Sequence, residues 1–190
     1  MNSYFSEAGS FLIETIFGFF ILLVMLRFIL QSIRADFYNP LSQFIVKITD
    51  PLLKPLRRII PGFGGVDIAS IVLMLLLKIM SILLIILIAG KPMHIAVIAV
   101  LTVGGLISLA IYVFIFSIFI MAIISWISPG GYNPVLALIQ QITEPVMRPI
   151  RRYVKPVSGL DLSPMIALLL LYLVAMAIPH LQRSILGLFV

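Results

Sequence analysis

The sequence predicts an all-α integral membrane protein with four transmembrane helices as two parallel tandem repeats, each with a proline-broken amphipathic cytoplasmic elbow. Three observations predict this class. The 190 residues are 62% hydrophobic and 11% charged, with a mean hydropathy of +1.23, whereas soluble domains carry about 25% charged residues. Four apolar runs are long enough to cross a bilayer, which takes about 20 residues. Finally, an offset of 94 residues aligns one half of the chain with the other.

The predicted spans divide evenly between repeats at residues 1–90 and 91–190. They are expected at residues 11–33, 66–90, about 106–128 and about 164–185. The apolar run from Ile95 to Ser128 has 34 residues, and its roughly 50 Å of helix is too long for one crossing and too short for two. We therefore expect an extension from residue 95 that bends at Val103–Gly105. The last span either ends near Pro179 or continues through it with a kink.

Basic residues predict the orientation of these spans. Nine of the 13 Lys and Arg residues fall in the two loops that join the spans within each repeat. Cytoplasmic loops carry an excess of Lys and Arg, so both loops are expected in the cytoplasm and both termini outside. The N-terminal stretch lacks the basic start and the cleavage site of a signal peptide, and the first span is therefore expected to stay in the mature protein.

The two basic loops repeat one another residue by residue. From Tyr38 to Arg58 the copies align without a gap, with 10 identities in 21 positions. Elbows are therefore expected at residues 38–61 and 132–156. The matched residues are Asn39 with Asn133, Pro40 with Pro134, Thr49 with Thr143, Asp50 with Glu144, Pro51 with Pro145, Pro55 with Pro149, Arg57 and Arg58 with Arg151 and Arg152, and Asp67 with Asp161.

Each elbow has the pattern of a short helix lying on a membrane surface. The first helix of each elbow is expected to end at Asp50 or Glu144, because a residue before proline is disfavoured in the α region. A second proline, four residues on, would cost about 3 kcal/mol inside a helix, so we expect a turn between the two. Basic residues opposite apolar ones suit binding to anionic headgroups. Asp67 and Asp161 are expected to cap the spans that follow.

The first elbow and its flanks, "DFYNPLSQFIVKITDPLLKPLRRIIPGFGGVD", resemble the signature of the YggT family of small bacterial membrane proteins, which has plastid relatives. The stretches "ISWISPGGYNP" and "GLDLSP" are similar to the other half of that family's pattern. The resemblance covers most of the chain. It implies an inner-membrane protein linked to osmotic or salt stress tolerance, with relatives connected to nucleoid distribution, division and plastid cytochrome assembly. It implies no agreed molecular activity.

Two sets of charged residues are candidate sites. The elbow set is a candidate surface for anionic lipid or a partner, or else serves only to fix topology; it comprises Lys54, Arg57, Arg58, Arg148, Arg151 and Arg152. The other set lies within the spans. Lys78 is near mid-span, where a charge costs about 3 kcal/mol. It is expected to have a role in conduction or in ion pairing. The alternative is that its side chain extends to the interface or stays buried as a neutral lysine. Glu14 is expected to reach the interface, about two helical turns from the depth of Lys78, so we do not pair them. Arg27 is expected to reach headgroups or to face Asp36 or Asp67.

Residue types needed for enzyme chemistry are scarce. The absence of cysteine excludes disulfides, thiolate nucleophiles and Cys-ligated metals. His94 and His180 have no ligand-spaced partner, so no metal or other cofactor is expected, and no nucleic acid is expected as a partner. We therefore predict a non-enzymatic scaffold or assembly factor, linked to osmotic or envelope stress tolerance, that docks on anionic lipid of the cytoplasmic leaflet and on an unknown membrane protein. The alternative is a channel or transporter component for ions or osmolytes, which would need a homo-oligomer.

Overall fold

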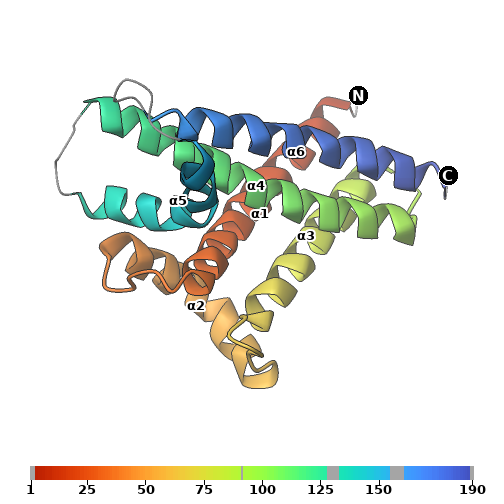
Figure 1. The fold of residues 1–190 in the computed structure, drawn as a ribbon. Helices are drawn as coiled ribbons and strands as arrows, with labels where there is room; N and C mark the ends of the chain where they lie inside the picture. Colours follow the sequence, from red (N-terminus) through yellow and green to blue (C-terminus); the bar gives the residue numbers. More distant parts are fainter. Residues whose placement is uncertain (1–2, 91, 128–132, 155–160, 189–190) are drawn as a thin grey trace.

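The structure is a computed structural model that describes residues 3–90, 92–127, 133–154 and 161–188, and these residues form six helices and no strand (Figure 1). Four of the helices are long and apolar enough to cross a membrane. They are α1 (Ser3–Ser32), α3 (Ile68–Ala89), α4 (Ile95–Ile127) and α6 (Ser163–Leu186). Two shorter amphipathic helices, α2 (Pro40–Ile59) and α5 (Pro134–Tyr153), are the elbows. The predicted four spans and two elbows are confirmed.

The four long helices form two hairpins, one per repeat. Helix α1 packs with α3, and α4 packs with α6 alongside it (Figure 1). The hairpins meet mainly where α3 contacts α4, while α2 rests on α1 and α3 and α5 rests on α4 and α6. Both elbows lie at one end of the bundle, and the two chain termini lie toward the other (Figure 1). We call the first of these the elbow end.

Each elbow helix begins in the same way, for a reason visible in its sequence. The side-chain oxygen of Asn39 accepts a hydrogen bond from Leu41 N–H at 3.0 Å, and Asn133 accepts one from Val135 N–H at 2.8 Å. A cap of this kind satisfies a backbone donor that has no partner within the helix. Pro40 and Pro134 follow at the first helical position, where proline's missing N–H costs nothing. The Asn-Pro pairs are therefore helix starts.

Neither elbow helix ends at its first proline, so that prediction is wrong. Helix α2 continues through Pro51 and Pro55, and α5 through Pro145 and Pro149. Figure 1 shows instead that both helices change direction partway along. Each proline removes one backbone hydrogen bond and crowds the carbonyl of the preceding turn, which bends a helix without necessarily ending it. Apolar side chains on both sides of the bend are buried against the bundle, and that burial offsets the cost.

Helix α4 runs continuously from Ile95 to Ile127, and Figure 1 shows no sharp bend in it, so the bend predicted at Val103–Gly105 is wrong. The two glycines make room for neighbouring side chains. A Cβ atom on Gly104 would collide with the side chain of Gln182 from α6, and one on Gly105 would lie 3.0 Å from Cε of Lys78 from α3. Helix α6 runs through Pro179 to Leu186, so the last span does not end at this proline.

Candidate functional site at the elbow end

Arg27 ties the first elbow to the first span. Its side chain is 5% exposed, and its Nη1 donates to Asp50 Oδ1 and to Thr49 Oγ1, both at 2.7 Å. Lys54 Nζ lies 2.8 Å from the other oxygen of Asp50. Arg27 therefore reaches neither the surface nor Asp36 or Asp67, and those expectations are wrong. The reason is that α2 lies across α1 with its Thr-Asp pair facing inward.

The second repeat builds the same junction without charge. Met121 occupies the position that corresponds to Arg27 at the 94-residue offset, and Thr143 Oγ1 lies 3.3 Å from its sulfur. Glu144, which corresponds to Asp50, is exposed, and its oxygen is 3.8 Å from Nη1 of Arg151. The two elbows therefore share a shape but differ in charge, because only the first contains a buried ion pair.

A second repeated contact joins the end of each elbow to the span that follows. Arg57 Nη2 lies 2.5 Å from Asp67 Oδ2 and donates to Gln31 Oε1 at 2.9 Å. In the second repeat, Arg151 Nε lies 3.2 Å from Asp161 Oδ2. The first arginine of each pair is therefore held by an aspartate within its own repeat. Arg57 is half-buried by this contact, whereas Arg58 and Arg152 are exposed.

Asp67 caps α3 as predicted. Asp161 lies one residue before the cap position of α6 and is therefore not the cap of that helix. Asp67 accepts hydrogen bonds from Ser70 N–H and from the Ser70 hydroxyl. Asp161 accepts from Ser163 N–H at 2.9 Å, while Leu162 occupies the cap position of α6. Part of the elbow predicted at residues 132–156 lies outside the described residues. Burial disfavours the charged form of Asp67, but hydrogen bonds from Arg57 and Ser70 outweigh it and lower the pKa of that carboxyl.

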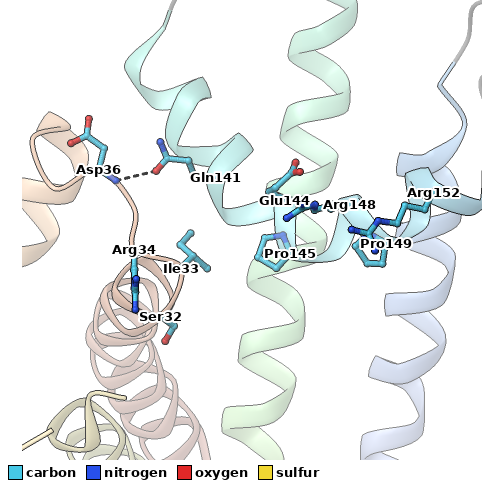
Figure 2. A pocket seen from close by; sticks show the side chains of 10 residues that line it. All are labelled: Ser32, Ile33, Arg34, Asp36, Gln141, Glu144, Pro145, Arg148, Pro149 and Arg152. Carbon is cyan, nitrogen blue, oxygen red and sulfur yellow. Dashed lines mark hydrogen bonds between the residues drawn. The ribbon is translucent and has the colours of Figure 1, made fainter. Parts of the chain in front are cut away.

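A cleft of about 870 Å³ opens between the two repeats at the elbow end. Figure 2 shows the end of α1 on one side of it and α5 on the other. The backbone N–H of Asp36 donates to Gln141 Oε1 across the cleft at 3.0 Å. The charged residues that line it are Arg34, Arg148 and Arg152, with Asp36 and Glu144. Cations therefore outnumber carboxylates in this cleft.

Arg34 holds a backbone conformation that favours glycine. Its φ is 54°, and the next amide, Ala35 N–H, reaches back to Leu30 O at 2.9 Å to close the end of α1. A side chain in this region costs about 1–2 kcal/mol relative to glycine. Arg34 is therefore a strained residue, and it lines the cleft. The sequence identifies Arg34 only as one of the loop cations that set the topology, because no local sequence pattern marks a positive φ at arginine.

The six predicted elbow cations therefore fall into two groups. Arg57 and Arg151 are used in ion pairs that fix the elbows. The other four, Lys54, Arg58, Arg148 and Arg152, are exposed at the elbow end, as Arg151 also is. Arg148 and Arg152 also line the cleft, and Lys54 also pairs with Asp50.

Two of the three candidate charges within the spans line a second, smaller pocket. Lys78 and Glu14 both line a cavity of about 230 Å³, together with Ser81, Ser108 and Tyr112. The two charged groups form no ion pair there among the described residues. They nevertheless line the same pocket, in which the long lysine side chain lies beside Gly105. Which faces of α1 and α3 point at one another could not be deduced from either span alone.

Comparison with known proteins then identifies the family. The model of the family described as CCB3/YggT matches residues 6–88 and, again, residues 100–182. The chain belongs to the CCB3/YggT family. The two matches begin 94 residues apart, which is the offset between the matched elbow residues. The resemblance and the tandem repeat predicted from the sequence are therefore confirmed.

Several CCB3/YggT-like relatives match almost the whole chain. An uncharacterised protein of Pseudomonas aeruginosa is 45% identical over 175 residues, which is 91% of this chain and 89% of that protein. The uncharacterised protein YggT of Escherichia coli K12 is 38% identical over 184 residues, 92% of this chain and 91% of its own. An uncharacterised protein of Vibrio alginolyticus is 43% identical over 159 residues, covering 83% and 85% of the two chains. No solved structure matches.

The lowered pKa of Asp67 predicts acid sensitivity in this YggT-family fold. Between the folded and unfolded pKa values the unfolded chain binds the extra proton, so stability rises with pH there. The contribution is fully present above the ordinary carboxyl pKa of about 4, and it is lost as pH falls through the lower, folded pKa. We expect the Tm advantage of the wild type over Asp67→Asn in detergent micelles to be constant above about pH 5 and to shrink on further acidification. An advantage that persists in full at the lowest pH at which the protein stays folded would contradict this.

Proposed function

We propose that this protein is a non-enzymatic scaffold of the bacterial inner membrane that binds anionic lipid, and docks a partner membrane complex, through the elbow end. In this proposal the elbows are cytoplasmic, the termini are periplasmic, and the physiological role is tolerance of osmotic and envelope stress. The observation that carries it is the cationic cleft between the repeats, where Arg34, Arg148 and Arg152 gather.

The division of labour among the elbow charges supports the proposal. Arg27, Arg57 and Arg151 are neutralised by aspartates and hold the elbows in place. The exposed cations that remain are attracted to anionic headgroups at about 1 kcal/mol each near a membrane surface. Together Lys54, Arg58, Arg148 and Arg152 could therefore supply about 4 kcal/mol.

The apolar residues of α2 also support a position at the membrane surface. Leu41, Leu52 and Ile59 are exposed. They lie 11 and 7 residues apart, which are about three and two helical turns, so they form one stripe along the helix. The stripe lies beside the basic residues and is separate from the buried stripe that packs on the bundle. An amphipathic helix of this kind lies in the interface, with its apolar face toward the acyl chains.

The test is to change Lys54, Arg58, Arg148 and Arg152 together to Gln. We expect slower growth in hyperosmotic salt than with the wild type. We also expect loss of the higher Tm in phosphatidylglycerol nanodiscs relative to phosphatidylcholine ones, because roughly 4 kcal/mol of headgroup attraction is removed. The matched control exchanges Lys for Arg and Arg for Lys at the same positions and should behave as the wild type. A cysteine introduced at position 92 checks that the variant keeps its orientation.

The pocket that holds Lys78 and Glu14 favours a second candidate, an oligomeric channel or transporter component. An ionisable residue within a span marks an ion or proton path by default, and this one faces hydroxyl groups across a small cavity. Lys78→Leu separates the two proposals in the same growth assay. If Lys78→Leu fails while the four-Gln variant grows normally, the scaffold proposal is wrong.

A further inference from the structure

The contact between the two repeats is asymmetric, because each repeat contributes a different surface to it. The start of the second elbow packs against the end of the first span, and the Nδ2 of Asn39 donates to Pro134 O at 2.6 Å. Leu138 and Ile142 belong to the core cluster that the first repeat builds around Leu30. Their neighbour Ile139 belongs instead to the separate cluster of the second repeat. One face of α5 therefore packs on its own hairpin, and the adjacent face packs on the other repeat.

The corresponding face of α2 is uncovered at Phe44. At the 94-residue offset, Phe44 corresponds to Leu138 and Pro40 to Pro134. Leu138 is 1% exposed, whereas Phe44 is 53% exposed. Ile48, the counterpart of Ile142, is partly buried against the core of the first repeat. Phe44 is therefore the part of this surface that the first repeat leaves exposed and the second repeat buries against its neighbour.

The other half of the contact is uncovered as well, on the second repeat. Asn39 is 7% exposed, but its counterpart Asn133 is exposed, and Asn133 Nδ2 has no hydrogen-bond partner among the described residues. Ile29, near the end of α1, is 6% exposed, while its counterpart Ile123 on α4 is 38% exposed. The chain therefore contains this interface once, between its two repeats. It also exposes a second copy of each half, one on the first repeat and the other on the second.

We propose that these two surfaces bind one another between copies of this chain, with α2 of one copy against the end of α4 of the next. Asn133 would then donate to the Pro40 carbonyl of a second copy, as Asn39 donates to Pro134 within the chain. A heterologous contact forms a closed assembly if its rotation closes. The smallest such assembly is a dimer with four repeats around one axis normal to the membrane.

A second copy fits this face because the chain already contains its complement. Lipid tails can cover Phe44, and water can solvate the exposed amide of Asn133, but only a second copy engages both surfaces at once, as Asn39 and Leu138 do within the chain. The inference is independent of headgroup binding, since the exposed cations take no part in it. It also differs from the pocket around Lys78, which lies between the spans of one copy.

Introduced cysteines test the contact directly, because the chain has none of its own. In isolated membranes, a short bifunctional thiol crosslinker should convert Phe44→Cys/Ile123→Cys and Pro40→Cys/Asn133→Cys to a species of double mass. When the two cysteines of a pair are carried by differently tagged copies, the crosslinked product should carry both tags. The matched variant Asn39→Cys/Pro134→Cys should crosslink within one chain and keep the monomer mass. Phe44→Cys paired with Leu169→Cys, an exposed position on α6, should not react between copies.

A monomeric product from Phe44→Cys/Ile123→Cys, with Asn39→Cys/Pro134→Cys linked internally, would overturn the proposal and leave lipid as the cover of α2. The unmodified protein provides a measurement that needs no folding of a variant. Its mass in nanodiscs, by native mass spectrometry, should be that of two or more copies, and a monomer alone would equally overturn the proposal. The four-Gln variant described above should keep the same mass, so failure of lipid binding and failure of association are distinguishable.

Discussion

Replacing Arg27 with Met is expected to lower the free energy of unfolding by about 3 kcal/mol, the low end for breaking a buried ion pair. The substitution leaves the Asp50 carboxylate without its buried partner and Thr49 without the donor at 2.7 Å. Lys54 still reaches Asp50, which is why the loss should not be larger. Thermal and denaturant unfolding in a fixed detergent would measure it.

The second repeat supplies the matched control for this prediction. Met121 already occupies the corresponding position, beside Thr143, and Met121→Leu should cost less than about 1.5 kcal/mol because the volume is conserved. Arg27→Met/Asp50→Asn should recover part of the loss, since no unpaired carboxylate remains. Equal stability of Arg27→Met and the wild type would show that the pair contributes nothing.

The spans, the repeat and the helix caps could be predicted because each depends on short stretches of sequence. Hydropathy, a fixed offset and an Asn-Pro pair are all visible without knowing which helices touch. The partner of Arg27 could not be found in this way, because it depends on how α2 crosses α1. Comparing the repeats does not reveal the pair either. The second repeat has Met121 in place of Arg27, but it keeps an acid, Glu144, in place of Asp50.

The prolines show a local rule being outweighed by packing. Proline costs about 3 kcal/mol inside a helix, which is why the elbow helix was expected to end at Asp50. Thr49 and Leu53 are both fully buried, one on each side of Pro51, and burying a leucine side chain contributes about 1.5–3 kcal/mol. A bent but continuous helix keeps both contacts. The cleft residue Arg34 escaped prediction for a related reason, because its unusual φ follows from how α1 meets the first elbow.

Replacing Asp67 with Ala is expected to cost about 2–3 kcal/mol, from the lost cap and from leaving Arg57 without its partner. The carboxylate is buried, accepts from Ser70, and lies 2.5 Å from the Arg57 guanidinium. It therefore fixes both the start of α3 and the end of α2. Unfolding in detergent would give the stability, and proteolysis at the 60–66 connection would report release of the elbow.

Asp161→Ala is the matched control, and it should cost less than about 1 kcal/mol because exposed ion pairs contribute little. Asp161 is not the cap residue of α6 and its pair with Arg151 is exposed, at 3.2 Å. Arg57→Lys should lose part of what Asp67→Ala loses, since lysine keeps the charge without the fork that also reaches Gln31. If the two aspartate variants were equally stable, the Asp67–Arg57 contact would not hold its elbow more firmly than the Asp161–Arg151 contact holds the other. The buried Arg27 contact would then have to account for any difference between the repeats.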